Sequence, residues 1–159
     1  MNSIGDAVTK EELHGVTAQV WSAMADMVLA PAADQRGPTK KDGYVAANVQ
    51  IIGTWQGAVR LDMDMRLARA TTAKLLMIEE SEVSGEDLED AAGELANMTG
   101  GGFKTLIEER LAEAHCLSCP SVAIGQDYEL FIPRATIIYE VPFTSDFGRL
   151  MVTISEKAH

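Results

Sequence analysis

The sequence predicts an α+β domain in which an antiparallel sheet of about six strands carries long helices packed on one face. Segments with apolar residues every three or four positions, typical of amphipathic helices, alternate with paired segments rich in strand formers. The order is helix, two strands, helix, then helix and strands again, so the second half loosely repeats the first. Paired strands with short turns favour an antiparallel sheet. We expect a single domain over residues 1–159.

The first helix is expected over residues 9–28. Apolar residues recur three or four positions apart from Leu13 to Met27, which is helical spacing. Thr9 followed three residues later by Glu12 is a capping-box pattern, in which each side chain bonds the other residue's backbone N–H. The helix should therefore begin just after Thr9.

A loop and a hairpin follow the first helix. Residues 29–43 hold two prolines and two glycines without periodicity, so we expect a loop there. Residues 44–53 and 57–65 are expected to be two strands joined by a short turn. Apolar and polar residues alternate over 59–65, which predicts a strand with one face in water.

Two further helices are predicted in the middle of the chain. Residues 66–78 are helix formers and predict a short helix. Residues 79–90 contain seven carboxylates, and Ser84 with Asp87 forms a second capping pattern inside this acidic segment. Acidic side chains suit the positive end of a helix dipole, so much of this charge marks the start of a helix that runs to about Leu111.

The last part of the chain is predicted to supply three or four strands. They are expected at residues 121–124, 128–132, 135–143 and 148–155.

The helix that ends near Leu111 has two distinct faces. At 100° per residue, the buried stripe consists of Leu88, Ala92, Leu95, Thr99, Phe103 and Leu106. The opposite, exposed line consists of Asp90, Glu94, Asn97, Gly101 and Glu108. Gly100 could end the helix, but the later apolar residues stay in phase with the stripe, which favours a continuous helix through the three glycines at 100–102. Glycines on the exposed line would let another molecule approach closely.

Composition excludes several classes of partner. Thirteen Lys and Arg against 24 Asp and Glu give a net charge of −11, which repels nucleic-acid phosphates and anionic lipid heads. No stretch approaches the roughly 18 apolar residues of a membrane span, and the first residues do not resemble a signal peptide. Two cysteines are too few for a disulfide framework. We therefore expect a cytoplasmic protein that binds neither nucleic acid nor membranes.

The exposed line carries a spaced motif. Glu94 follows Asp90 after three residues, Asn97 follows Glu94 after two, and Pro120 follows Asn97 after 22. This spacing resembles the signature of the CheC, CheX and FliY chemotaxis phosphatases, in which Asp or Ser, Glu, Asn and Pro stand at the same intervals. Residues 94–101, 120–125 and 148–154 are similar to CheX in particular.

The resemblance implies a function and a site. Such proteins remove phosphate from the aspartyl phosphate of a CheY-like response regulator, so a phosphorylated response regulator is the expected partner. Asn97 would position the attacking water, and Glu94 would pair with a lysine of the regulator. Asp90, Gly101 and Pro120 are expected in the partner-binding surface. The protein would need no cofactor of its own, since Mg²⁺ would belong to the regulator, and a homodimer is expected by the same resemblance.

One departure from the family pattern concerns the first helix. CheC-type members carry a second site there, but Gln19 and Ser22 stand here where Glu and Asn would be needed, and Gly15 stands in the Asp or Ser place. We therefore expect one site per chain, as in CheX.

Other interpretations remain open. The same helix face could bind a receiver domain without catalysis, or sit in a flagellar-switch or signalling assembly. Cys116 and Cys119 have thioredoxin-like spacing, but the strand and helix context of such a site is missing, so packed or semi-exposed thiols are expected. His115 stands beside them without ligand spacing, and no metal site is predicted.

Overall fold

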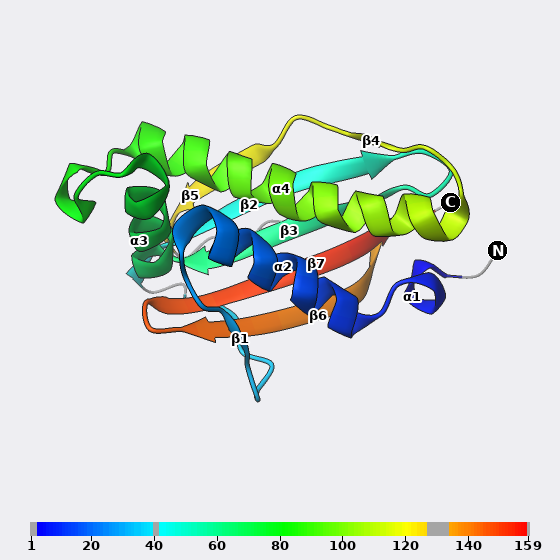
Figure 1. Ribbon diagram of the computed structural model, residues 1–159, viewed down its shortest axis with the longest axis horizontal. Helices are drawn as coiled ribbons and strands as arrows, with labels where there is room; N and C mark the ends of the chain where they lie inside the picture. Colours follow the sequence, from blue (N-terminus) through cyan, green and yellow to red (C-terminus); the bar gives the residue numbers. More distant parts are fainter. Residues whose placement is uncertain (1–2, 40–41, 127–133, 159) are drawn as a thin grey trace.

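The computed structural model describes residues 3–39, 42–126 and 134–158, and helices α2, α3 and α4 lie on one face of its sheet (Figure 1). The helical elements are α1 (Ile4–Ala7), α2 (Lys10–Ala25), α3 (Met65–Leu76), the 3₁₀ turn η2 (Glu80–Glu82) and α4 (Gly85–Leu111). The strands are β1 (Ala30–Pro31), β2 (Tyr44–Ile52), β3 (Gly57–Asp64), β4 (Cys116–Leu117), β5 (Ser121–Gly125), β6 (Ala135–Ser145) and β7 (Gly148–Lys157).

The described strands form one antiparallel sheet. Their order is β1-β6-β7-β3-β2-β4, and β5 also pairs with β2. The hairpins β2–β3 and β6–β7 meet at the centre of the sheet. Strand β1, which precedes the first hairpin, pairs with β6, the outer strand of the second. Strand β5, which precedes the second hairpin, pairs with β2, the outer strand of the first. This arrangement confirms the α+β prediction and relates the two halves of the chain.

The described residues form seven strands against the six or so expected, because β1 and β4, with two residues each, were not predicted. The loop predicted over 29–43 therefore includes a short strand, in which Ala30 and Pro31 pair with Thr144 and Phe143. Proline is tolerated on such an edge strand, where a ladder hydrogen bond is not required of it. The strand predicted at 128–132 lies outside the described residues.

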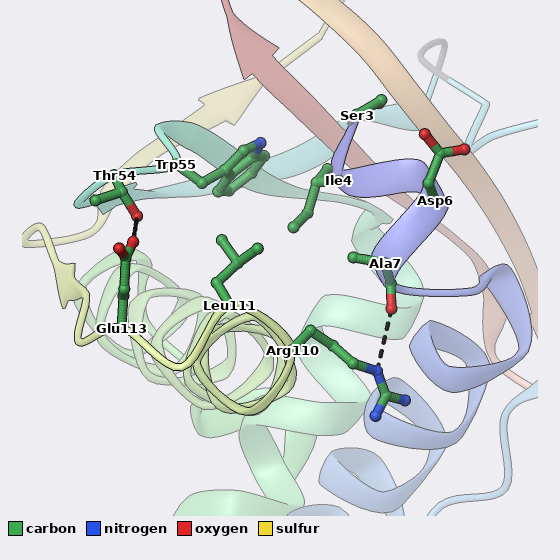
Figure 2. A pocket seen from close by; sticks show the side chains of 9 residues that line it. All are labelled: Ser3, Ile4, Asp6, Ala7, Thr54, Trp55, Arg110, Leu111 and Glu113. Atoms are coloured by element: carbon green, nitrogen blue, oxygen red, sulfur yellow. Dashed lines mark hydrogen bonds between the residues drawn. The ribbon is translucent and has the colours of Figure 1, made fainter. Parts of the chain in front are cut away.

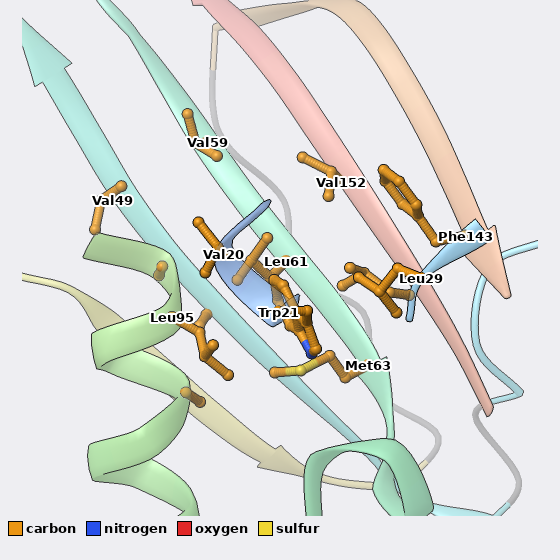
Figure 3. Close-up of a cluster of buried hydrophobic side chains, with 14 of the residues drawn as sticks. Val20, Trp21, Leu29, Val49, Val59, Leu61, Met63, Leu95, Phe143 and Val152 are labelled. Atoms are coloured by element: carbon orange, nitrogen blue, oxygen red, sulfur yellow. The ribbon is translucent and has the colours of Figure 1, made fainter. Parts of the chain in front are cut away.

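The core lies between the inner face of the sheet and the helices (Figure 3). Val49, Leu61 and Val152 project from neighbouring strands toward Trp21 of α2 and Leu95 of α4, and all five are at most 1% exposed. Burying side chains of this size stabilises a fold by about 1.5–3 kcal/mol each relative to exposure. The predicted apolar stripe of α4 is thus confirmed as its core face.

The polar face predicted on β3 is only partly open to solvent. Arg60 and Asp64 are half-buried, and Asp62 is 7% exposed. Arg60 Nε donates to Asp62 Oδ2 at 2.8 Å, and β3 lies between β2 and β7. The buried carboxylate of Asp62 is therefore paired with Arg60 at the centre of the sheet.

The helix starts were predicted correctly. Thr9 and Glu12 form a capping box at α2, and Ser84 and Asp87 form one at α4. The acidic segment before Ser84 is a 3₁₀ turn at 80–82 rather than part of the long helix. The predicted short helix is confirmed as α3.

Helix α4 continues through its three glycines as predicted, and two of them have an internal reason. A methyl group at Gly100 would lie 2.4 Å from Val49 Cγ2, and one at Gly102 would lie 2.6 Å from Val16 Cγ1. These glycines let α4 lie directly on β2 and on α2. The expectation that they clear space for a partner is therefore wrong for Gly100 and Gly102.

Candidate functional site

The candidate site lies on the solvent side of α4. Leu88, Leu95 and Phe103 hold the opposite side of the helix in the core, each at most 4% exposed. Because α4 has 27 residues and is anchored along its length, the exposed line that bears Glu94 and Asn97 is held rigidly. Glu94 is exposed and Asn97 is half-buried.

Four of the five predicted site residues, Asp90, Glu94, Asn97 and Pro120, meet in one groove between α4 and the start of β5. The groove has a volume of about 430 Å³ and is lined by Glu89, Asp90, Gly93, Glu94, Asn97, Pro120 and Val122. Pro120, distant in sequence, therefore lies beside the helix residues of the motif. Within residues 3–39, 42–126 and 134–158, the side chains of Glu94 and Asn97 make no hydrogen bond or ion pair. Both are free to contact another molecule.

Three carboxylates stand along this groove. Glu89 and Asp90 are exposed beside the exposed Glu94. Such a cluster produces a negative potential that favours a cationic edge on whatever enters. An amide, a carboxylate and a shallow open cleft can orient water and dock a charged surface, but they do not enclose a small molecule.

Sequence reasoning missed three lining residues: Glu89, Gly93 and Val122. Glu89 and Gly93 stand eight and four positions before Asn97, so helical spacing could have placed them on its line. Val122 reaches the groove because β5 pairs with β2 and packs beside α4, which no local pattern indicates.

Gly101 lies outside the residues that line the groove. It is half-buried one turn beyond Asn97, and a methyl group there would meet Leu117 Cδ1 at 3.9 Å, an ordinary contact. Its role in partner binding stays a prediction.

Sequence comparison decides the family. The family model described as chemotaxis phosphatase CheX matches residues 45–144, which span the hairpin β2–β3, α3, all of α4 and most of β6. The chain belongs to the CheX family. No curated protein matches it in overall sequence.

Solved structures share the fold. The chemotaxis protein CheX from Vibrio vulnificus has a TM-score of 0.79 at 22% identity, with 99% of this chain and 100% of that chain covered. A CheX from Desulfovibrio desulfuricans has a TM-score of 0.75 at 22% identity, with coverages of 92% and 97%. A complex of CheX with CheY, BeF₃ and Mg²⁺ from Borrelia burgdorferi has a TM-score of 0.67 at 20% identity, with coverages of 95% and 99%.

The corresponding line of α2 differs from the CheX motif in structure as well as in sequence. Gln19 and Ser22 are exposed on α2, and a methyl group added at Gly15 would have nothing within 4 Å. The face at Gly15 is therefore open, whereas the face at Gly93 is walled by Pro120.

The two cysteines of this CheX family member are not joined by a disulfide. Both thiols are free and exposed, so the expectation of packed or semi-exposed thiols is wrong. Cys116 and Leu117 form β4, and Ser118 N donates to Gln50 O at 2.9 Å, so the chain is extended there.

His115 has a structural role. It is buried, its Nε2 accepts from Trp55 N at 3.2 Å, and its Nδ1 lies 3.0 Å from Glu113 O. Both ring nitrogens are therefore occupied. Among the described residues, no group of three or more His, Cys, Asp or Glu side chains is arranged to hold a metal ion.

A second cavity, of about 500 Å³, lies between α1, the β2–β3 turn and the end of α4 (Figure 2). Its polar groups bond to one another: Thr54 donates to Glu113, and Arg110 Nε donates to Ala7 O at 3.1 Å. Trp55 lines it as well, and its indole N–H is bonded to Glu156 at 2.8 Å. These bonds join the three elements, and none of the motif residues lines this cavity.

Proposed function

We propose that this CheX family member accelerates hydrolysis of the aspartyl phosphate of a CheY-like response regulator. The observation that carries the proposal is the groove in which Glu94, Asn97 and Pro120 meet, with the first two unengaged on a rigid helix. Family membership supports a chemotaxis phosphatase. The complex of the Borrelia relative with CheY supports the class of partner.

Asn97 would orient the water that attacks phosphorus. An acyl phosphate is already activated, so a neutral amide that holds water in line can accelerate its hydrolysis without a strong base. The water oxygen forms the new P–O bond as the bond from phosphorus to the aspartyl oxygen breaks. The products are inorganic phosphate and the free aspartate, and the proton of the water leaves with the phosphate.

Glu94 would dock the partner. Its exposed carboxylate would pair with a lysine beside the regulator's phosphoryl group, and Glu89 and Asp90 would add to the negative potential that attracts that edge. Mg²⁺ would be held by the regulator, so we propose no cofactor bound to this chain itself. Asp90, Gly101 and Pro120 are proposed to contact the partner.

The test is the decay of a phosphorylated CheY-like regulator with and without the protein. We expect acceleration by the wild type and loss of acceleration in Asn97→Ala. If the wild type has no effect, or if Asn97→Ala accelerates decay as well as the wild type does, the proposal is wrong. Phosphorylation-dependent binding without turnover would instead support a non-catalytic receiver-binding module.

We further infer that residues 1–159 act as one domain in the cytoplasm and assemble as a homodimer. Ile52 and Ile137 are large apolar side chains that stay 47% and 57% exposed on the sheet strands, and a second copy would cover such surface. No described helix has the length and apolar character needed to cross a bilayer. Light scattering on the eluting protein should give twice the chain mass, and a monomer would contradict the dimer.

A further inference from the structure

One position in the groove has no assigned role. Gly93 directly precedes Glu94 in the interior of α4, where glycine is a poor helix former. It is buried, and it lies against Pro120. A methyl group at position 93 would stand 3.2 Å from Pro120 Cγ, 3.7 Å from Pro120 Cβ and 3.8 Å from Val122 Cγ2. The first distance is too short for relaxed packing, and the other two are ordinary contacts.

Pro120 is held in place from both sides. Before it, Ser118 Oγ accepts from Gln50 N at 2.9 Å, and Ser118 N donates to Gln50 O at 2.9 Å. After it, Ser121 and Val122 pair with β2. The β5 wall of the groove therefore cannot shift without disturbing its pairing with β2.

The helix wall is held as firmly. Gly100 of α4 lies so close to Val49 of β2 that a methyl group there would be only 2.4 Å from Val49 Cγ2. Both walls of the groove thus rest on β2, one through backbone pairing and one through close packing. Gly93 and Pro120 are the contact that joins the two walls next to Glu94.

We propose that Gly93 is a positioning residue for the phosphatase reaction. The missing side chain lets Pro120 rest on the helix and sets the distance between the α4 wall, which bears Glu94 and Asn97, and the β5 wall. A partner that contacts both walls then meets Asn97 at a fixed depth. This inference rests on the proposed function, and it concerns how the groove places Asn97 rather than any contact of Gly93 with substrate.

A double-mutant cycle between Gly93→Ala and Pro120→Ala tests the contact. Pro120→Ala removes Cγ, the atom at 3.2 Å, and keeps Cβ, which lies at an acceptable distance. In the wild-type background we expect Gly93→Ala to lower kcat about fivefold, because a shift of a few tenths of an ångström misplaces the attacking water. In the Pro120→Ala background the same change should alter kcat less than twofold.

The melting temperature separates a positioning role of Gly93 from a purely structural one. Alanine is the better helix former, so Gly93→Ala should leave the melting temperature unchanged or raised while kcat falls. Gly15→Ala is the matched control, because a methyl group there meets nothing within 4 Å. It should raise the melting temperature similarly and leave kcat unchanged.

The outcomes are distinguishable. If the wild type is active and Gly93→Ala has the same effect on kcat in both backgrounds, or none, the positioning role is overturned. If the wild type itself does not accelerate decay, the proposed phosphatase function fails. In that case the same four proteins are compared by their affinity for a CheY-like regulator that carries a beryllofluoride phosphoryl mimic. If Gly93→Ala changes this affinity equally with and without Pro120→Ala, the contact between Gly93 and Pro120 has no role in binding and the inference is again rejected.

Discussion

Helices α2 and α4 occupy comparable places in the two halves of the molecule, yet one carries a groove and the other does not. Each is the long helix ahead of a hairpin and covers the same face of the sheet (Figure 1). On α4, Pro120 packs against the buried Gly93 next to Glu94, whereas Gly15, Gln19 and Ser22 on the corresponding line of α2 are open to solvent. A shared scaffold therefore does not imply a shared site; the side chains and the neighbouring strand decide.

The difference between α4 and α2 is tested most directly by alanine substitutions at Asn97 and at the corresponding position of α2, Ser22. Asn97→Ala should reduce the rate acceleration about 100-fold, the usual cost of removing one oriented polar group from a reaction centre. Ser22→Ala, at the corresponding position of α2, should leave the rate within twofold of the wild type. Single-turnover decay of the phosphorylated regulator measures both, and equal effects would show that α2 also takes part.

The glutamate position should show a smaller effect on docking. Glu94→Gln should raise KM about tenfold with a lesser change in kcat, because an interfacial charge pair is lost. Gln19→Glu on α2 should leave KM unchanged, because residue 19 does not line the groove into which the partner would dock. Steady-state kinetics at low and high salt checks this result. If the KM of Glu94→Gln depends on salt concentration as steeply as the KM of the wild type does, the docking role of Glu94 is contradicted.

Alanine substitutions at Gly100 and at Gly101 of α4 should change the free energy of unfolding in opposite directions. Gly100→Ala should lower the free energy of unfolding by about 1–3 kcal/mol, because its methyl group would force α4 away from Val49. Gly101→Ala should raise it by up to about 1 kcal/mol, because alanine favours the helix and Leu117 lies at an ordinary distance. Urea unfolding measures both, and destabilisation of similar size in the two variants would contradict the packing described for Gly100.

The smallest expected effect is a pH dependence shared by the two helices. The Thr9 backbone N–H and the charge of Arg110 hold the pKa of Glu12 below its ordinary 4.5, and the His115 backbone N–H and Lys104 do the same for the pKa of Glu108. In each case the unfolded chain binds the proton more readily, so this stabilisation is present above the ordinary pKa and is lost as pH falls through the lowered one.

Urea midpoints at about pH 7 and about pH 4 test this coupling. Glu12→Gln and Glu108→Gln should each show a smaller drop in midpoint between the two conditions than the wild type. The neighbouring exposed Glu109→Gln serves as the control and should keep the wild-type drop. Because both carboxylates remain partly open to solvent, at 28% side-chain exposure each, the differences should be small.

Much of the fold follows from local patterns. The capping boxes at Thr9 and Ser84 were predictable because they depend on residues three positions apart. The core stripe of α4 followed from helical periodicity, and the central hairpins followed from strand formers around short turns. The exposed line with Glu94 and Asn97 followed from the same periodicity.

Other features depended on neighbours that are distant in sequence. Strands β1 and β4 have two residues each and no periodicity of their own; they exist because β6 and β2 offer free edges. Asp62 of β3 is buried in a central strand, where Arg60 pairs with it, and the alternation along one strand does not reveal this. Gly100 and Gly102 face Val49 and Val16, so the reason for these glycines became visible only in the packed structure.

The amino-acid sequence alone determined the helices, the hairpins, the acidic character and the spaced polar residues, because each depends on interactions within a few positions. Only the tertiary structure decided that Pro120 and Val122 close a groove beside Glu94 and Asn97 and that Glu89 and Gly93 belong to it. The physical reason is that β5 reaches α4 through its pairing with β2, a strand more than 60 residues earlier in the chain.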